Sequence, residues 1–210
     1  MVCDAYLFLK IKNRALNPSP ARENTCQPIY KVYAMQTENL LNFATCDLCD
    51  AHKTDNTSGF RVLSPVFKNF GGQQKFSGPV VTIKCFEDNS LVKAAVDSAG
   101  QGRILVVDGG ASLRRALLGG NLGGAAAKNG WVGVVIDGCV RDVAELAQCS
   151  TGIRALAVVP RPPEKCGEGQ RDVAVQIQGV WVRPGDWLYA DEDGMVVMPA
   201  PTTTWLVMPL

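Results

Sequence analysis

Two uninterrupted apolar segments in the middle of the chain constrain its fold more than any other feature. "RILVVD" covers residues 103–108 and "WVGVVIDG" covers residues 131–138. A short apolar run without polar alternation is typical of a strand that is buried on both faces, as in a parallel sheet. Because parallel strands need a crossover connection, we expect helices between and after the two strands.

Helical patterns are found beside these segments. Leu91, Val92, Ala95 and Val96 have helical spacing, and Gly100 is a candidate C-cap for that helix. We predict a short helix over 112–120 ("SLRRALLGG"), another that is stopped at Asn129-Gly130, and a third over 142–149. This order predicts an α/β unit in the middle of the chain.

The remaining segments have sequence patterns that are typical of strands. "FSGPVVTIKCF" (76–86) predicts a strand with Pro79 at its beginning, and "RALAVVP" (154–160) predicts another. Residues 173–199 alternate between apolar and polar types, with turn signals at Gly179, Pro184-Gly185 and Asp193-Gly194. The whole sequence therefore predicts an α/β fold with a mixed sheet flanked by helices.

Composition excludes several classes of partner. The formal net charge is +1, so nothing in the charge balance indicates direct binding of nucleic acid. No apolar run reaches the roughly 18 residues that a membrane-spanning helix needs. Residues 1–34 have no clear signal peptide and contain several prolines, so we expect an irregular N-terminal extension followed by one domain over 35–210. We expect a cytoplasmic protein with reduced cysteines, and import into an organelle through residues 1–34 stays open.

The cysteine pair in "CDLCDAH" has two interpretations. Cys46, Cys49 and His52 resemble half of a metal site, but the chain has no second such pair and no other histidine. The alternative is that these residues only begin a helix, with Thr45 as its N-cap.

The tetrad Arg-Asp-Val-Ala occurs twice, at 141–144 and at 171–174. The second copy follows the loop "CGEGQ" and leads into an alternating strand, where Arg171 and Asp172 would point to opposite faces. We interpret it as an exposed loop or strand edge. The first copy follows the buried segment 131–138, at the carboxyl end of a strand, where ligands gather in open α/β sheets.

The first copy and the glycine-rich "GGNLGG" (119–124) can each also be interpreted without a ligand, and these interpretations remain open. Asp142 and Glu145 have the spacing of a capping box, which needs no ligand. The glycines could form a plain turn between helices. Alternatively, they could cradle an anion with backbone N–H groups at the start of the next helix.

If the site interpretations hold, this edge of the sheet combines three kinds of group. Arg141 could bind a substrate carboxylate bidentately, opposite the backbone N–H groups. Asp142 could hold Mg²⁺ or Mn²⁺, which prefer oxygen ligands. A cation beside a bound 2-oxo acid would stabilise an enolate.

Long stretches of the sequence resemble the RraA-like family, which includes the regulator of ribonuclease activity A and the 4-hydroxy-4-methyl-2-oxoglutarate aldolases. They are "GRILVVDGGASLRRALLGGNLGGAAAKNGWVGVVIDGCVRDVAEL", "FSGPVVTIKCFEDNSLVKAAV", "CDLCDAH", "GIRALAVVPRP" and "GEGQRDVAVQIQGVWVRPGDWLYADEDGMVV", and together they cover about 45–198. The resemblance implies an α/β/β sandwich like the swivelling phosphohistidine domain, and a homotrimer or a hexamer of two trimers.

The resemblance also implies an activity and a site. The aldolases of this family cleave 4-hydroxy-4-methyl-2-oxoglutarate to two pyruvates with a divalent metal, and they decarboxylate oxaloacetate. Carried over by position, the substrate-binding loop is Gly119, Gly120, Asn121 and Leu122, the substrate arginine is Arg141, and the metal ligand is Asp142. Arg141 and Asp142 would thus be the catalytic residues.

One position departs from the family's aldolase pattern, and it keeps a second function open. Gly120 stands where the aldolases have an Asp, whose loss could be compensated by Asp108, by Asp137 or by a neighbouring subunit. The alternative function is that of a non-catalytic regulator that binds a ribonuclease and inhibits it. A third label attached to relatives, quinone methyltransferase, is disfavoured because the half of the chain after "VVDGGAS" is rich in strand patterns.

Overall fold

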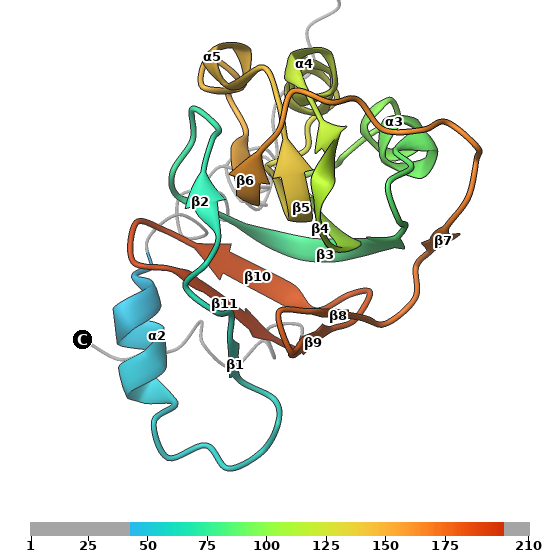
Figure 1. Ribbon diagram of the computed structural model, residues 1–210. Helices are drawn as coiled ribbons and strands as arrows, with labels where there is room; N and C mark the ends of the chain where they lie inside the picture. The colour runs from blue at the N-terminus through green and yellow to red at the C-terminus, as the bar shows by residue number, and fades with distance from the viewer. Residues whose placement is uncertain (1–42, 200–210) are drawn as a thin grey trace, which may run out of the picture.

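The computed structural model describes residues 43–199, and its centre is a parallel four-stranded sheet (Figure 1). The four strands are β3 (Phe76–Lys84), β4 (Ile104–Leu118), β5 (Gly133–Val140) and β6 (Gly152–Val158), and they are neighbours in that order. The two apolar segments of the sequence form adjacent parallel strands, as predicted.

Antiparallel strands extend this centre on both sides. On the side of β3 the order is β3-β10-β11-β1, β2 pairs with β6 on the other side, and β7 pairs with the second half of β3. A separate hairpin is formed by β8 and β9. The mixed α/β fold is confirmed. The bounds are β1 Arg61–Val62, β2 Lys68–Asn69, β7 Gln170–Arg171, β8 Val175–Ile177, β9 Val180–Val182, β10 Trp187–Ala190 and β11 Met195–Met198.

Three helices cover one face of the parallel centre: α3 (Ser90–Val96), α4 (Gly120–Lys128) and α5 (Val143–Leu146) (Figure 1). The short α2 (Thr45–Ala51) lies apart from them, near β11 and β1. None of the helices in the part of the chain that the structure describes is long and apolar enough to span a membrane. The predicted boundary between residues 34 and 35 lies outside the described residues.

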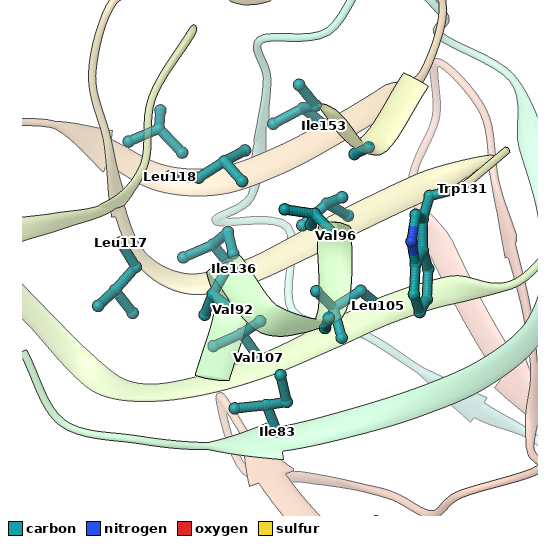
Figure 2. Close-up of a cluster of buried hydrophobic side chains, with 14 of the residues drawn as sticks. Ile83, Val92, Val96, Leu105, Val107, Leu117, Leu118, Trp131, Ile136 and Ile153 are labelled. Atoms are coloured by element: carbon teal, nitrogen blue, oxygen red, sulfur yellow. The ribbon is translucent and has the colours of Figure 1, made fainter. Parts of the chain in front are cut away.

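The core has two parts, which explains why the central strands are apolar without alternation. Leu105 and Val107 belong to the cluster under the helices, shown in Figure 2. Ile104 and Val106 belong to the cluster on the opposite face, with residues of β8, β9, β10 and β11. Because side chains alternate along a strand, a strand covered on both faces needs apolar residues at every position.

The predicted helix over 112–120 is wrong, because β4 continues through it to Leu118. Register shifts separate the pairs that β4 makes with β5: Asp108 with Asp137, Ser112 with Gly138, Ala116 with Cys139 and Leu118 with Val140. The bend begins at Gly110 and Ala111, whose φ angles are +63° and +52°. The bulges return Leu117 and Leu118 to the core, whereas Leu113 is 58% exposed, so the helix-like spacing of the leucines does not mark one buried face.

Smaller expectations were also wrong. Thr45 is the first residue of α2 rather than its cap, and its hydroxyl donates to Asp191 Oδ1 at 2.6 Å. Pro79 lies inside β3, where this strand leaves its antiparallel partner β10 and joins β4. Helix α3 has its C-cap at Asp97 rather than at Gly100. The predicted stop at Asn129-Gly130 is confirmed as the end of α4.

Candidate active site

The ends of β4 and β5 bring the first Arg-Asp pair next to the glycine segment. The Arg141 N–H donates to the Leu118 carbonyl at 2.9 Å, so the chain leaves both strands side by side. A Cβ built on Gly119 would lie 3.1 Å from Arg141 Nε and 2.6 Å from Asp142 Oδ2. Any larger residue at position 119 would therefore displace the Arg141 and Asp142 side chains from this arrangement.

The segment 119–122 is a strand-to-helix junction and not a turn between two helices. Gly119 is the N-cap of α4, and Gly120, Asn121 and Leu122 form its first turn. The backbone N–H groups of a first helical turn have no acceptor within the helix, and the helix dipole makes this end attractive to anions. The Gly120 N–H donates to Asp142 Oδ2 and the Leu122 N–H donates to the Gly119 carbonyl, so Asn121 is the candidate donor of this segment to a bound anion.

The Asp142 carboxylate turns toward this helix end rather than toward its own helix. Its Oδ2 accepts a hydrogen bond from the Gly120 N–H at 3.2 Å, and no side-chain capping bond joins Asp142 to α5. Asp142 has the left-handed backbone conformation, with φ +57° and ψ +46°, which aspartate tolerates better than most residues. Asp142 is the N-cap residue of α5 by position, but its carboxylate makes no capping hydrogen bond, so the capping-box interpretation is wrong.

Arg141 and Asp142 present their charges together. Arg141 Nε lies 3.4 Å from Asp142 Oδ2, and the side chains are 40% and 41% exposed. Both side chains can therefore be reached from solvent, and the remaining guanidinium N–H groups of Arg141 are available to a planar anion.

A third charged residue, Glu145, belongs to this group and was not assigned to the site from the sequence. A Cβ on Gly120 would overlap the Glu145 carboxylate and would lie 2.7 Å from Glu145 Cβ. The Glu145 side chain thus occupies the space that a side chain at position 120 would take. The signal was present in the spacing of Asp142 and Glu145, which we interpreted only as a capping box.

These residues fit a hard divalent cation with few protein ligands. Two carboxylates lie beside Gly120: Asp142 Oδ2 accepts its N–H, and the Glu145 side chain packs against its Cα. Within residues 43–199, no group of three His, Cys, Asp or Glu side chains is arranged to hold a metal. One or two carboxylates plus waters are the usual protein contribution to a Mg²⁺ site.

Asp108 and Asp137 form a separate polar pair on β4 and β5. Asp137 is 3% exposed and accepts from Gln178 Nε2 at 2.7 Å, while Asp108 Oδ2 lies 3.6 Å from Lys84 Nζ. Burial raises the pKa of Asp137, and the charge of Asp108 raises it further. Their contacts tie them to β3 and to the β8–β9 hairpin, so neither takes the place of a carboxylate at Gly120.

The other sequence candidates lie elsewhere. Arg171 and Asp172 are exposed at the edge strand β7, as we expected for the second copy. The Cys46 thiol contacts Asp193 Oδ2 at 3.5 Å, and this hydrogen bond raises the pKa of the thiol, which disfavours the thiolate that a metal needs. The His52 ring stacks on Phe60. Among residues 43–199 these side chains do not form a group of three that could hold a metal.

Comparison with known proteins decides the family. The RraA-like family model, described as Aldolase/RraA, matches residues 45–197. The chain belongs to the RraA-like family. A relative from Albidiferax ferrireducens, named "Putative 4-hydroxy-4-methyl-2-oxoglutarate aldolase", is 72% identical over 164 residues, covering 74% of this chain and 95% of the relative. A relative of the same name from Burkholderia multivorans is 56% identical over 158 residues, covering 75% and 96%.

Solved structures share this RraA-like fold. The RNA-processing inhibitor RraA from Thermus thermophilis superposes with a TM-score of 0.73 at 45% identity, covering 78% of this chain and 96% of that one. A Geobacillus kaustophilus protein described as an S-adenosylmethionine:2-dimethylmenaquinone methyltransferase has a TM-score of 0.71 at 41% identity, covering 76% and 96%. The two names describe different functions, so the fold alone does not assign one.

Proposed function

We propose that this RraA-like protein is a divalent-metal-dependent lyase that forms pyruvate from small 2-oxo acids. Its reactions would be cleavage of 4-hydroxy-4-methyl-2-oxoglutarate to two pyruvates and decarboxylation of oxaloacetate. The observation that carries the proposal is the meeting of Arg141, Asp142 and Glu145 at the N-terminus of α4. The names of the most similar relatives agree with a lyase.

Arg141 would bind and orient the substrate. Its side chain is accessible and anchored at the backbone by the bond to Leu118, so the guanidinium can hold a carboxylate in a fixed direction. The Asn121 N–H in the first turn of α4 would face the same anion from the other side, since the Gly120 N–H already donates to Asp142 Oδ2. Two-sided binding would fix the 2-oxo group relative to the bond that breaks.

Asp142 and Glu145 would hold the cation, Mg²⁺ or Mn²⁺. When bound, the cation would supply electrostatic stabilisation to the negative charge that develops on the 2-oxo oxygen. In the aldol cleavage, the bond between C3 and C4 breaks, its electron pair passes to C3 as a pyruvate enolate, and the C4 hydroxyl loses its proton to become the carbonyl of the first pyruvate. Uptake of one proton at C3 turns the enolate into the second pyruvate, so the proton count balances. Loss of CO₂ from oxaloacetate leaves the same enolate, so one arrangement of charged groups serves both reactions.

A coupled assay for pyruvate release tests the proposal. We expect turnover of both substrates with added Mg²⁺ or Mn²⁺, loss of turnover with EDTA, and recovery when excess metal is restored. Turnover that continues unchanged in EDTA, or no pyruvate from either substrate with any of the metals, would contradict the proposal.

The second candidate function is a non-catalytic regulator that inhibits a ribonuclease. The likeness to the RNA-processing inhibitor RraA favours it. The discriminating measurement is RNA cleavage by a purified ribonuclease from the same organism, with and without this protein. Inhibition by a preparation that releases no pyruvate would favour the regulator over the lyase.

We further propose that the chain assembles as a homotrimer, or as a hexamer of two trimers. The candidate site lies open at the surface, and exposed apolar side chains lie nearby at Val143 and Val158, which are 40% and 49% exposed. Light scattering after size exclusion should give about three or six times the 22.5 kDa of one chain. A monomeric mass would contradict this part of the proposal.

A further inference from the structure

A hollow apart from the candidate active site lies where β3 ends and where its parallel pairing with β4 ends, at Lys84 and Asp108. Its volume is about 560 Å³, it is open to solvent, and it is lined by Lys84, Phe86, Asp108, Gly110 and Glu168 among others. One wall is the segment that leads into β7, which the buried Asp88 holds through hydrogen bonds from the N–H groups of Cys166 and Glu168 at 2.6 and 3.2 Å. The carboxyl ends of parallel strands are where open α/β sheets bind ligands.

Charges of both signs line this hollow. Asp108 is 6% exposed; its Oδ1 accepts from the Gly110 N–H at 3.0 Å, and its Oδ2 faces Lys84 Nζ at 3.6 Å. That separation is beyond hydrogen-bonding distance, and the Lys84 side chain is 59% exposed. The ammonium can therefore move to another anion while the carboxylate receives another donor.

The rim of the hollow is aromatic. Phe86 is 60% exposed, and the Arg114 guanidinium lies 5.8 Å from the centre of its ring. An exposed aromatic face next to a buried carboxylate suits a ligand with an apolar body and a charged head.

The hollow is separate from the candidate active site. None of the residues that line it is Arg141, Asp142, Glu145 or a member of 119–122. The bulged part of β4, from Gly109 to Arg115, separates Asp108 from the end of this strand at Leu118. Occupation of one site can therefore be measured without the other.

We propose that this hollow binds an α-amino acid with an apolar or aromatic side chain. Lys84 would pair with the carboxylate of the ligand, Asp108 with its ammonium group, and Phe86 would contact its side chain. The mixed charge distinguishes this ligand from a 2-oxo acid, which has no ammonium group for Asp108 and would leave that carboxylate without a new donor.

Calorimetric titration of the full chain with three matched probes tests the proposal. L-phenylalanine has both charges, 3-phenylpropionate lacks the ammonium group, and 2-phenylethylamine lacks the carboxylate. We expect L-phenylalanine to bind at least about tenfold more tightly than either analogue, because each analogue leaves one charged group without its partner. Equal binding of all three, or no heat from L-phenylalanine up to about 10 mM, would overturn the proposal.

Variants locate the binding. Lys84→Met and Asp108→Asn should each weaken L-phenylalanine binding about tenfold. The amide oxygen of the asparagine can still accept the Gly110 N–H, so the bend of β4 is kept. Lys93→Met is the matched control, since Lys93 on α3 is 57% exposed and does not line the hollow. Loss of binding in Lys93→Met or Arg141→Ala, with retention in Lys84→Met, would place the ligand elsewhere and overturn the proposal.

Discussion

At the scale of single residues, the site depends on which atoms compete for one small volume beside Gly120. Glycine at this position leaves room for the Glu145 side chain, and the Gly120 N–H reaches Asp142 Oδ2 at 3.2 Å. A carboxylate on residue 120 and the present conformation of Glu145 exclude each other. Residues 120 and 145 are therefore alternative sources of the second carboxylate.

This exclusion predicts the outcome of a carboxylate exchange. Glu145→Ala should lower kcat/KM for oxaloacetate by about 100-fold and weaken activation by Mn²⁺, because it removes one of the two carboxylates that we propose to hold the cation. Adding Gly120→Asp to Glu145→Ala should restore much of the activity, since the new side chain enters the space left free. Steady-state kinetics over a range of Mn²⁺ concentrations measures both effects.

The control for this exchange is Glu192→Ala, which removes an exposed glutamate from the turn after β10. It should leave kcat/KM unchanged. A Glu145→Ala variant as active as the wild type would show that Glu145 only fills space over Gly120.

At the scale of elements, the central strands were predictable because burial on both faces determines their composition. The bulged end of β4 was not, since the exposed Leu113 and the buried Leu117 and Leu118 of this strand have the same spacing as leucines on a helix face. The direction of the Asp142 side chain depends on a positive φ angle, which the sequence does not reveal for a residue other than glycine. The placement of 119–122 beside Arg141 and Asp142 could be anticipated because the carboxyl ends of neighbouring parallel strands lie at one edge.

The junction of β3, β5 and β6 is close-packed around one ring. Phe76 is fully buried, and a Cβ on either Gly133 or Gly152 would overlap its ring. Gly152→Ala should therefore lower the free energy of unfolding by about 2 kcal/mol or more, because the ring has no space to move into. Denaturant unfolding measures this change.

Gly124→Ala is the matched control for Gly152→Ala. A Cβ on Gly124 would meet nothing within 4 Å, and the residue lies on α4. Since alanine favours a helix over glycine, this variant should be neutral or more stable by up to about 1 kcal/mol. Equal destabilisation by both variants would contradict the packing argument.

Asp88 anchors the segment before β7 in a pH-dependent way. Burial alone would raise the pKa of Asp88, but hydrogen bonds from Ser90, Glu168 and Cys166 outweigh it and lower the pKa from 3.8 to about 2. A lowered folded-state pKa adds stability that is complete above the unfolded value of 3.8 and is lost as the pH falls toward 2. Asp88→Ala should lower the free energy of unfolding at pH 7 by about 3 kcal/mol.

The difference in unfolding free energy between the wild type and Asp88→Ala isolates this residue from the other acidic groups. It should be constant from about pH 7 to pH 5 and should shrink as the pH falls below about 4. A difference that stays the same down to about pH 2 would contradict the role of the ionised carboxylate.

At the scale of the whole molecule, the parallel strands carry two separate polar regions, and β4 contributes to both. Where β4 and β5 end, Arg141 and two carboxylates lie at the start of α4. The end of β3 and the middle of β4 carry Lys84 and Asp108, which line the hollow. The match to the RraA-like family model, over residues 45–197, includes both regions. The repeated tetrad supplies an internal comparison, because its two arginines occupy different settings in one chain.

Kinetics of Arg141→Ala beside Arg171→Ala test the central claim most directly. Arg141 lies between Gly119 and Asp142, whereas Arg171 is exposed on the edge strand β7. With Mg²⁺ present, pyruvate release from oxaloacetate and from 4-hydroxy-4-methyl-2-oxoglutarate should fall at least about 100-fold in Arg141→Ala and stay at the wild-type rate in Arg171→Ala. Wild-type rates in a folded Arg141→Ala variant would contradict the assignment of this edge of the sheet as the active site.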